Sequence, residues 1–517
     1  MSSARLRSPG LLVPLLLATG WLVVLVMHLR QPFPSDQINY MRTAAQFPDP
    51  LNSALTHQIT RFGLVIPLRL SIALFGYSQA AYYSVALLGS LGLLLGTYTL
   101  GALLFSRWVG VVAAIVVVAA PPLFIESSDP LPDVPAAALI TLALALAVAI
   151  RQGRVPVRWW TLAGLGALLG WSYLVREFTV FLWPLVPLLI YPRVRRRGLL
   201  QVAWPVALAG LLEALLCQVL YGNPLARVHS ITGHGQAPSP PAIAATYRDK
   251  PRSVYVLRLP DVLAEHAGSG RLVLLIVFTL LGGALAALLW RRAPRWRELA
   301  LPAAWFLALW VPLVLLGGVL DPAAPKLRLQ LMRYWFPIFP AFALGGVGLV
   351  WLAAREAADR LSRRAATVAT ALPAVLVLLL GAVTAGPAVR SWWAESGTRA
   401  GGATQLAAFR TWMSEHGDGV PRVWSGRHTV RLLEIYRRGP FGGVAWQAKP
   451  TAALIGGARP APGDLVVFYD TDRGALCGFC RLTTEDIWGK PPRPEAGWRE
   501  VYATPDRLLR VYSVGTG

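Results

Sequence analysis

The chain has few charged residues for its length. Only 15% of its 517 residues are charged, whereas about 25% is usual in soluble globular proteins. Acids are the scarcer sign, with 26 Asp and Glu against 49 Lys and Arg, which gives a formal net charge of +23. Hydrophobic residues make up 55%, and the mean hydropathy is +0.50. This composition argues against a soluble enzyme or a disordered chain and indicates a membrane protein.

Cysteine and the common nucleotide and metal motifs are also scarce or missing. The three cysteines are too few for a disulfide scaffold. Cys477 and Cys480 form a C-x-x-C that predicts a local disulfide closing a turn, whereas Cys217 lies in an apolar run and is predicted to pack there. The sequence has no Walker loop, no His-Glu-x-x-His and no dinucleotide glycine fingerprint, which argues against nucleotide-driven transport by this chain alone.

Long apolar runs predict membrane-spanning helices, each needing roughly 20 residues. Eleven runs qualify, near residues 11–29, 81–104, 108–125, 131–150, 159–174, 178–191, 199–221, 272–290, 299–320, 334–353 and 366–386. Runs 159–174 and 178–191 have basic outer flanks, which predicts a tight helical hairpin with Arg176 and Glu177 at its turn. The stretch 62–76 carries Pro67 and Arg69 and is predicted to be an interfacial amphipathic helix.

The loops between these runs predict the orientation. Alternate connections hold 18 Lys and Arg against three acids, so the N-terminus is predicted in the cytoplasm and the C-terminal tail outside. Most of the net positive charge lies in these loops, where Lys and Arg contact lipid headgroups. A nucleic-acid partner is therefore not needed to explain the charge. A cleaved signal peptide over residues 1–30 is the alternative, which the length of that run disfavours. The amino-acid composition is rich in Ala, Arg, Gly and Leu, which suggests a bacterium of high genomic GC content. The host membrane would then be a bacterial cytoplasmic membrane.

The predicted fold class is an α-helical polytopic membrane protein with a small C-terminal extracytoplasmic α/β domain. Residues 1–386 form the transmembrane domain, with extracytoplasmic loops over 30–80 and 222–271. Residues 387–517 change to a soluble pattern, with helices near 402–416 and 428–438 and strands near 422–425, 464–469 and 508–513. A tail of about 130 residues is long enough to fold on its own.

Four external segments collect the polar residues that could do chemistry. They contribute Asp36, Tyr40, His57 and Arg61; Glu126, Asp129 and Asp133; Arg176 and Glu177; and Lys326, Arg333 and Tyr334. An acid in such a cluster can serve as a general base, and arginines hold phosphate by paired hydrogen bonds. The combination suits a sugar donor whose leaving group is a lipid phosphate.

Each candidate has a simpler interpretation. Asp36 is also a suitable N-cap for a helix beginning near Ile38, and single external arginines often extend to headgroups. Glu213, inside run 199–221, is harder to dismiss because intramembrane acids usually face a cavity or a partner, although it could equally hold two helices together. Glu126 and Asp129 offer hard oxygen ligands for Mg²⁺ or Mn²⁺. The loop 222–271 is predicted to cover the cavity.

Several short segments resemble, in their order along the chain, those of GT-C glycosyltransferases. These segments are Asp36 with Tyr40, Leu-Phe-Gly at 74–76, Leu-Pro-Asp-Val-Pro at 131–135, and Arg-Tyr-Trp-Phe-Pro-Ile-Phe-Pro at 333–340. The resemblance spans roughly residues 11–353 and is strongest to the branch of protein O-mannosyltransferases and lipid A aminoarabinose transferases, which is similar to glycosyltransferase family 39. Two departures are Gln37, where the family usually has a second acid, and Arg176, where it often has Lys.

The resemblance implies an inverting transfer from a polyprenyl-phosphate-linked sugar to an envelope glycan, lipid or protein at the outer face. Asp36 matches the catalytic base. We expect Arg61, Arg176, Lys326 and Arg333 to bind the donor phosphate, and Tyr40, His57, Glu126, Asp133 and Tyr334 to contact substrate. Two alternatives remain open. One is a transporter or flippase of lipid-linked or small anionic solutes, for which internal repeats are expected but not seen. The other is a polysaccharide polymerase or ligase on a different membrane fold.

Overall fold

The computed structural model describes residues 12–30, 32, 36–49, 57–234, 246–266, 268–361, 366–395, 400–438, 451–454, 459–470 and 478–515. The chain divides into two compact units. The first comprises Met1–His28, Pro48–Ile66 and Ala86–Trp392; the second comprises Leu29–Phe47, Pro67–Val85 and Trp393–Gly517. Each unit is described by itself.

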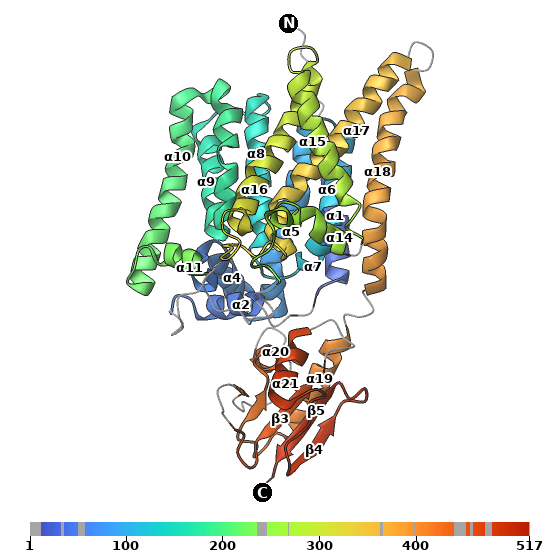
Figure 1. The fold of residues 1–517 in the computed structure, drawn as a ribbon. Helices are drawn as coiled ribbons and strands as arrows, with labels where there is room; N and C mark the ends of the chain where they lie inside the picture. Colours follow the sequence, from blue (N-terminus) through green and yellow to red (C-terminus); the bar gives the residue numbers. More distant parts are fainter. Residues whose placement is uncertain are drawn as a thin grey trace. The chain divides into compact units, whose positions relative to one another are not determined.

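The first unit is helical (Figure 1). Its main elements are α1 (Leu12–Met27), α3 (His57–Thr60), the start of α4 (Phe62–Phe75), most of α5 (Gln79–Leu104), α6 (Arg107–Val118), α7 (Pro121–Glu126), α8 (Asp133–Arg151), α9 (Trp159–Val175), η1 (Glu177–Leu182), α10 (Leu185–Tyr221) and α11 (Ala226–His234). After these come α13 (Arg252–Val256), α14 (Arg258–Glu265), α15 (Leu272–Leu288), η2 (Pro294–Leu299), α16 (Ala300–Val314), η3 (Leu315–Val319), η4 (Met332–Ile338), α17 (Phe339–Leu361) and α18 (Ala366–Glu395).

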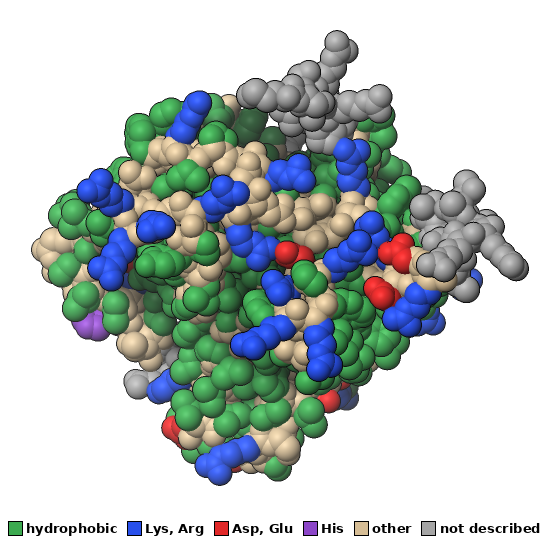
Figure 2. Space-filling model, turned by 90° about the horizontal axis from the view of Figure 1, so that it is seen from above, with side chains coloured by type: hydrophobic (Ala, Val, Ile, Leu, Met, Phe, Trp, Pro, Cys, Tyr) green, Lys and Arg blue, Asp and Glu red, His purple; other side chains and the backbone are tan. Residues whose placement is uncertain are grey.

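Many of these helices have the length or the composition of membrane spans. Among the described residues, Gln79–Leu104, Asp133–Arg151, Leu185–Tyr221, Pro294–Val319 and Met332–Arg360 are long and apolar enough to cross a membrane. Shorter apolar helices lie at Leu12–Met27, Phe62–Phe75, Arg107–Val118, Leu272–Leu288 and Ala371–Pro387. The multi-pass character is thus confirmed, while the count of eleven spans and their orientation stay predictions. Figure 2 shows a face on which Lys and Arg side chains clearly outnumber acids.

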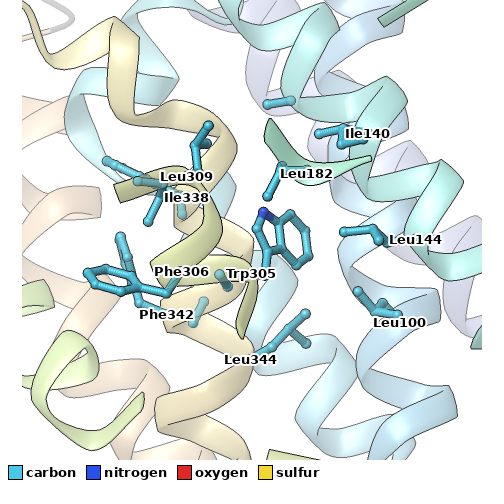
Figure 3. Packing of buried hydrophobic residues seen from close by; sticks show 14 of the residues in the cluster. Leu100, Ile140, Leu144, Leu182, Trp305, Phe306, Leu309, Ile338, Phe342 and Leu344 are labelled. Carbon is cyan, nitrogen blue, oxygen red and sulfur yellow. The ribbon is translucent and has the colours of Figure 1, made fainter. Parts of the chain in front are cut away.

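The core of this unit is built around α8, α16 and α17. The indole of Trp305 is fully buried and lies among Leu100, Ile140, Leu144 and Leu182 from neighbouring helices (Figure 3). Glycine allows some helices to approach closely: a Cβ on Gly101 of α5 would meet the Cα of Gly110 in α6 at 2.6 Å. By contrast α10 leaves Leu188 and Val219 largely exposed, as expected for a helix that faces lipid.

Helix α10 contains a sharp kink. Arg195 has φ 52° and ψ −162° in the middle of this 37-residue element. This backbone conformation is unfavourable for any residue other than glycine. Pro192 precedes Arg195 and removes a backbone donor. Predicted spans 178–191 and 199–221 thus correspond to two helical segments that meet at Arg195, within the predicted basic connection 192–198. The turn with Arg176 and Glu177 lies, as predicted, between α9 and the following helical segment.

The C-terminal part of the second unit forms the predicted α/β domain. Its helices are α19 (Ala400–His416), α20 (Arg427–Arg438) and α21 (Gly478–Trp488), and its strands are β1 (Val423–Ser425), β2 (Thr451–Ala453), β3 (Leu465–Tyr469), β4 (Trp498–Ala503) and β5 (Leu509–Val514). The strand order is β2-β1-β3-β5-β4. β1 is parallel to β2 and β3, whereas β5 is antiparallel to β3 and β4, so the sheet is mixed.

Aromatic side chains fill the core of this domain. Phe468 lies 4.3 Å from Trp488 and 5.0 Å from Tyr512 between ring centroids. Cys480 is disulfide-bonded, whereas Cys217 is a buried free thiol. Cys477 lies outside the described residues. The second unit also contains α2 (Asp36–Gln46) and the end of α4.

Candidate functional site

A cavity of about 490 Å³ lies in the first unit, bounded by the end of α9, η1, α11, η3 and the segment before η4. Its lining is Arg61, Tyr173, Glu177, Phe178, Val180, Phe181, Ile231, Thr232, Leu316, Lys326, Leu327 and Tyr334. Arg61, Glu177 and Lys326 supply charge, and most of the other lining side chains are apolar or aromatic. Such a cavity can hold a phosphate together with the first part of a hydrocarbon chain.

The turn after α9 sends two adjacent charged side chains in different directions. Arg176 caps α9 with φ −149° and ψ 117°, and its backbone N–H donates to Ser172 O at 2.8 Å. Arg176 is extended, whereas Glu177 is the first residue of η1, so the backbone changes conformation between them. Arg176 accordingly pairs with Asp133, while Glu177 pairs with Arg61. The hairpin that the sequence predicted is thus also the element that positions these charges.

Arg176 and Asp133 form a buried ion pair beside the cavity. Nη2 of Arg176 lies 3.0 Å from Oδ1 of Asp133, and their side chains are 3% and 0% exposed. The Arg176 guanidinium also lies over the rings of Tyr334, at 4.7 Å, and Phe178, at 5.1 Å. A cation in this position is stabilised by both aromatic rings. The pair therefore connects the start of α8 with two residues that line the cavity.

A chain of four alternating charges leads from the cavity into the protein. Arg61 lies 3.1 Å from Glu177, Glu177 lies 3.7 Å from Arg227, and Arg227 lies 2.6 Å from Glu213. Burial favours the neutral form of Glu177, but the guanidinium groups of Arg61, Arg176 and Arg227 outweigh this effect and hold its pKa well below the usual range. Glu177 is therefore an ionised carboxylate.

The backbone on both sides of Arg61 is held by α9, α10 and α11. Trp171 Nε1 donates to Gly63 O at 3.0 Å, Tyr221 Oη donates to Ile59 O at 2.9 Å, and the hydroxyls of Thr60 and Ser230 lie 2.9 Å apart. A Cβ on Gly63 would meet backbone atoms of Leu174 and Val175 at 2.6 Å. Only glycine permits this approach, which places Arg61 at the cavity.

The structure brings some of the predicted site residues together. Arg61, Lys326 and Tyr334 line the cavity, and Arg176 and Asp133 pair beside it. Arg333 precedes Tyr334 in η4 and is half-buried. Glu126 ends α7, and Asp129 follows it, almost fully buried. Which of these side chains bind donor or acceptor stays a prediction.

Three other predicted residues are placed less fully. Asp36 is the first residue of α2, where it is half-buried, and Tyr40 is fully buried in the same helix. Both belong to the second unit. His57 begins α3, but its side chain lies outside the described part of the chain. The catalytic role of Asp36 stays a prediction.

Two further predictions concern a metal and a covering loop. In the part of the chain that the structure describes, no three His, Cys, Asp or Glu side chains group closely enough to hold a metal ion. A site built on Glu126 and Asp129 stays a prediction. Ile231 and Thr232 of the predicted covering loop line the cavity, but residues 235–245 lie outside the described ranges.

Glu177 and Arg227 have partners in the structure that were not predicted from the sequence. Arg227 is 2% exposed and is the partner of Glu213. A signal for it existed, because an intramembrane acid such as Glu213 requires a partner, and Arg227 is the first cation after α10 ends. Glu213 thus has the helix-joining role that the second interpretation gave it.

Comparison with known proteins gives matches in sequence family and in fold. Residues 66–221 match the family of dolichyl-phosphate-mannose-protein mannosyltransferases. ArnT from Cupriavidus metallidurans bound to undecaprenyl phosphate superposes with a TM-score of 0.53 and 15% identity, over 98% of each chain. The Archaeoglobus fulgidus oligosaccharyltransferase tethered to an acceptor peptide gives 0.50 and 13%, over 98% of this chain and 74% of that one. No curated protein matches by sequence.

Proposed function

We propose that this chain moves a sugar from a polyprenyl-phosphate donor to an envelope acceptor. It is a GT-C glycosyltransferase, and its residues 66–221 match the family of dolichyl-phosphate-mannose-protein mannosyltransferases. The observation that carries the proposal is the cavity. It combines two cations, Arg61 and Lys326, with an apolar wall that includes Phe178, Phe181 and Leu327. A polyprenyl-phosphate donor presents the complementary groups, an anionic phosphate and a hydrocarbon tail, and the phosphate gains a second ionisable oxygen when the sugar leaves.

The proposed reaction is an inverting displacement. Asp36 takes the proton from an acceptor hydroxyl while that oxygen attacks the anomeric carbon of the sugar. The bond from the anomeric carbon to the phosphate oxygen breaks, and polyprenyl phosphate leaves with the electron pair. A general base of this kind contributes about 10²- to 10⁴-fold in rate.

The cations have distinct proposed tasks. Negative charge grows on the phosphate as it leaves, so Arg61 and Lys326 stabilise the transition state more than the bound donor. Lys326 is exposed in the cavity wall. Arg176 holds Phe178 and Tyr334 in place through its pair with Asp133. Arg333 is the remaining candidate phosphate ligand.

Location and acceptor belong to the same proposal. We propose that the cavity faces the outer side of a bacterial cytoplasmic membrane. The basic connections support an N-terminus in the cytoplasm, and the content of Ala, Arg, Gly and Leu supports a bacterial source. The acceptor is an envelope glycan, lipid or protein. ArnT, one of the similar structures, holds undecaprenyl phosphate, and the oligosaccharyltransferase holds a peptide. A supporting Mg²⁺ or Mn²⁺ at Glu126 and Asp129 is tested by adding a chelator to the transfer assay.

The test of the base is transfer of labelled sugar from polyprenyl-phosphate sugars to envelope extracts. We expect Asp36→Asn to lose about 10²-fold or more of the wild-type rate. Asp49→Asn is the matched control, because Asp49 is an exposed carboxylate of the same external loop. Equal rates for Asp36→Asn and wild type would remove Asp36 from the chemistry.

The test of the cavity uses its exposed lysine. We expect Lys326→Ala to lower kcat/KM by about tenfold to a hundredfold, whereas Lys250→Ala, which removes a lysine that does not line the cavity, leaves it unchanged. Retention of full activity by Lys326→Ala would place the donor phosphate elsewhere. Absence of transfer by the wild type with every donor would favour a carrier of lipid-linked solutes instead.

A further inference from the structure

The four-charge chain at the cavity has one carboxylate between two arginines. Oε1 of Glu177 lies 3.1 Å from Nη2 of Arg61, and Oε2 lies 3.7 Å from Nη2 of Arg227. Glu213 lies 2.6 Å from Nη1 of Arg227. Two cations and two anions make the chain neutral. Only Arg61 and Glu177 of these four line the cavity.

This arrangement creates a conflict when an anion enters the cavity. Arg61 already neutralises Glu177, so an arriving phosphate competes with that carboxylate for the same guanidinium. If Arg61 turned to the phosphate, Glu177 would become a largely buried carboxylate without its main partner. Breaking one side of a buried ion pair is strongly unfavourable unless another cation replaces it.

Arg227 is placed to be that replacement. Its side chain is 2% exposed, and Nη1 donates both to Glu213 and to Leu174 O, the latter at 2.9 Å. Nη2 donates to Tyr173 O, and the guanidinium lies 4.7 Å from the centre of the Tyr173 ring. These contacts fix Arg227 independently of Glu177. Its 3.7 Å distance to Glu177 exceeds the usual length of a charge-assisted hydrogen bond by about 1 Å.

We propose that Arg227 is a positioning residue that takes over Glu177 when Arg61 turns to the donor phosphate. The carboxylate of Glu177 moves by a fraction of a side-chain length from one arginine to the other, and no proton is transferred. Arg61 then binds the phosphate without competition from Glu177. Glu213 keeps Arg227 in place and balances its charge before the exchange. This role rests on the proposed function, because it needs a lipid phosphate in the cavity.

The proposal predicts that the effect of Arg227 depends on the charge of Glu177. We use Arg227→Met/Glu213→Gln, which removes a cation and its anion together so that no buried charge is stranded. The measured quantity is the Kd for polyprenyl phosphate, without sugar, in detergent or nanodiscs. We expect the double variant to raise this Kd about tenfold. In the Glu177→Gln background, where no carboxylate needs a new partner, we expect the same two substitutions to change it less than about twofold.

Matched controls separate this role from a purely structural one. The Kd for uncharged polyprenol of equal length should not change. Arg151→Met/Glu298→Gln removes an ion pair that does not line the cavity and should leave both affinities unchanged. Arg227→Lys keeps the cation and should therefore retain much of the wild-type affinity for polyprenyl phosphate.

Three results would overturn the inference. Equal loss of affinity with Glu177 and with Gln at position 177 would make Arg227 a structural residue only. No loss in either background would remove it from donor binding. Failure of the wild type to bind polyprenyl phosphate would overturn the proposed function itself, and with it this role, so the two failures are distinguishable.

Discussion

We predict how much the free energy of unfolding falls when the buried ion pair of Asp133 and Arg176 is broken. Asp133→Asn preserves the size of the side chain but leaves Arg176, which is 3% exposed, without its carboxylate. Leaving one member of a buried pair without its partner costs about 3 to 5 kcal/mol. Tyr334 and Phe178 lie within 5.1 Å of the guanidinium and offset part of this. We therefore expect a loss of about 3 kcal/mol, or about two orders of magnitude in the unfolding equilibrium.

The assay is equilibrium unfolding in mixed micelles of dodecyl maltoside and dodecyl sulfate, followed by circular dichroism. Asp133→Leu/Arg176→Met is the control, because replacing both charges by apolar groups of similar volume is often neutral. A loss below about 1 kcal/mol for Asp133→Asn would refute the argument. It would mean that water or another group compensates Arg176.

Three other substitutions test separate parts of the molecule. Gly63→Ala forces a Cβ to within 2.6 Å of the backbone at Leu174 and should cost about 1 to 3 kcal/mol, read as a lower thermal midpoint, whereas Gly164→Ala, with nothing within 4 Å, should not. The lowered pKa of Glu177 stabilises the fold at pH values above 4.5, the ordinary pKa of Glu, and this contribution is lost as the pH falls below 4.5. The free energy of unfolding of the wild type should therefore fall more steeply below pH 4.5 than that of Glu177→Gln. An equal slope would contradict this. Asp464→Ala removes the acceptor, at 2.7 Å, of the buried Trp424 indole and should speed hydrogen exchange in β1 and β3; unchanged exchange would show another acceptor.

The elements that could be predicted from the sequence are those that a hydrophobic run defines. Helices such as α5 and α8 follow from uncharged stretches, and β3 from the run Leu465–Tyr469, whose five residues are all buried. β4 was missed because this edge strand, Trp498–Ala503, carries exposed Arg499 and Glu500 and has no apolar run. β2 was missed because its residues, Thr451–Ala453, lack the large apolar side chains that the equally short β1 has in Val423 and Trp424.

The site shows the same division. Arg61, Lys326 and Tyr334 were found as external polar residues near predicted spans, which a single sequence can reveal. Their partners could not be found in this way, because pairing depends on contacts between distant segments. Arg61 and Glu177 are 116 residues apart. Arg176 stays a predicted phosphate ligand, but nothing in the sequence indicates that Asp133 lies beside it.

The kink in α10 has a consequence for the biogenesis of the protein. The helical segment before Arg195, Leu185–Val194, is about 15 Å long, roughly half the thickness of the hydrocarbon core. Such a segment is too short to leave the translocon as an independent span. We expect it to partition into lipid only together with α9, as a helical pair released in one step. The strained arginine would then be part of how the nascent chain is inserted, as well as of how the mature helix bends.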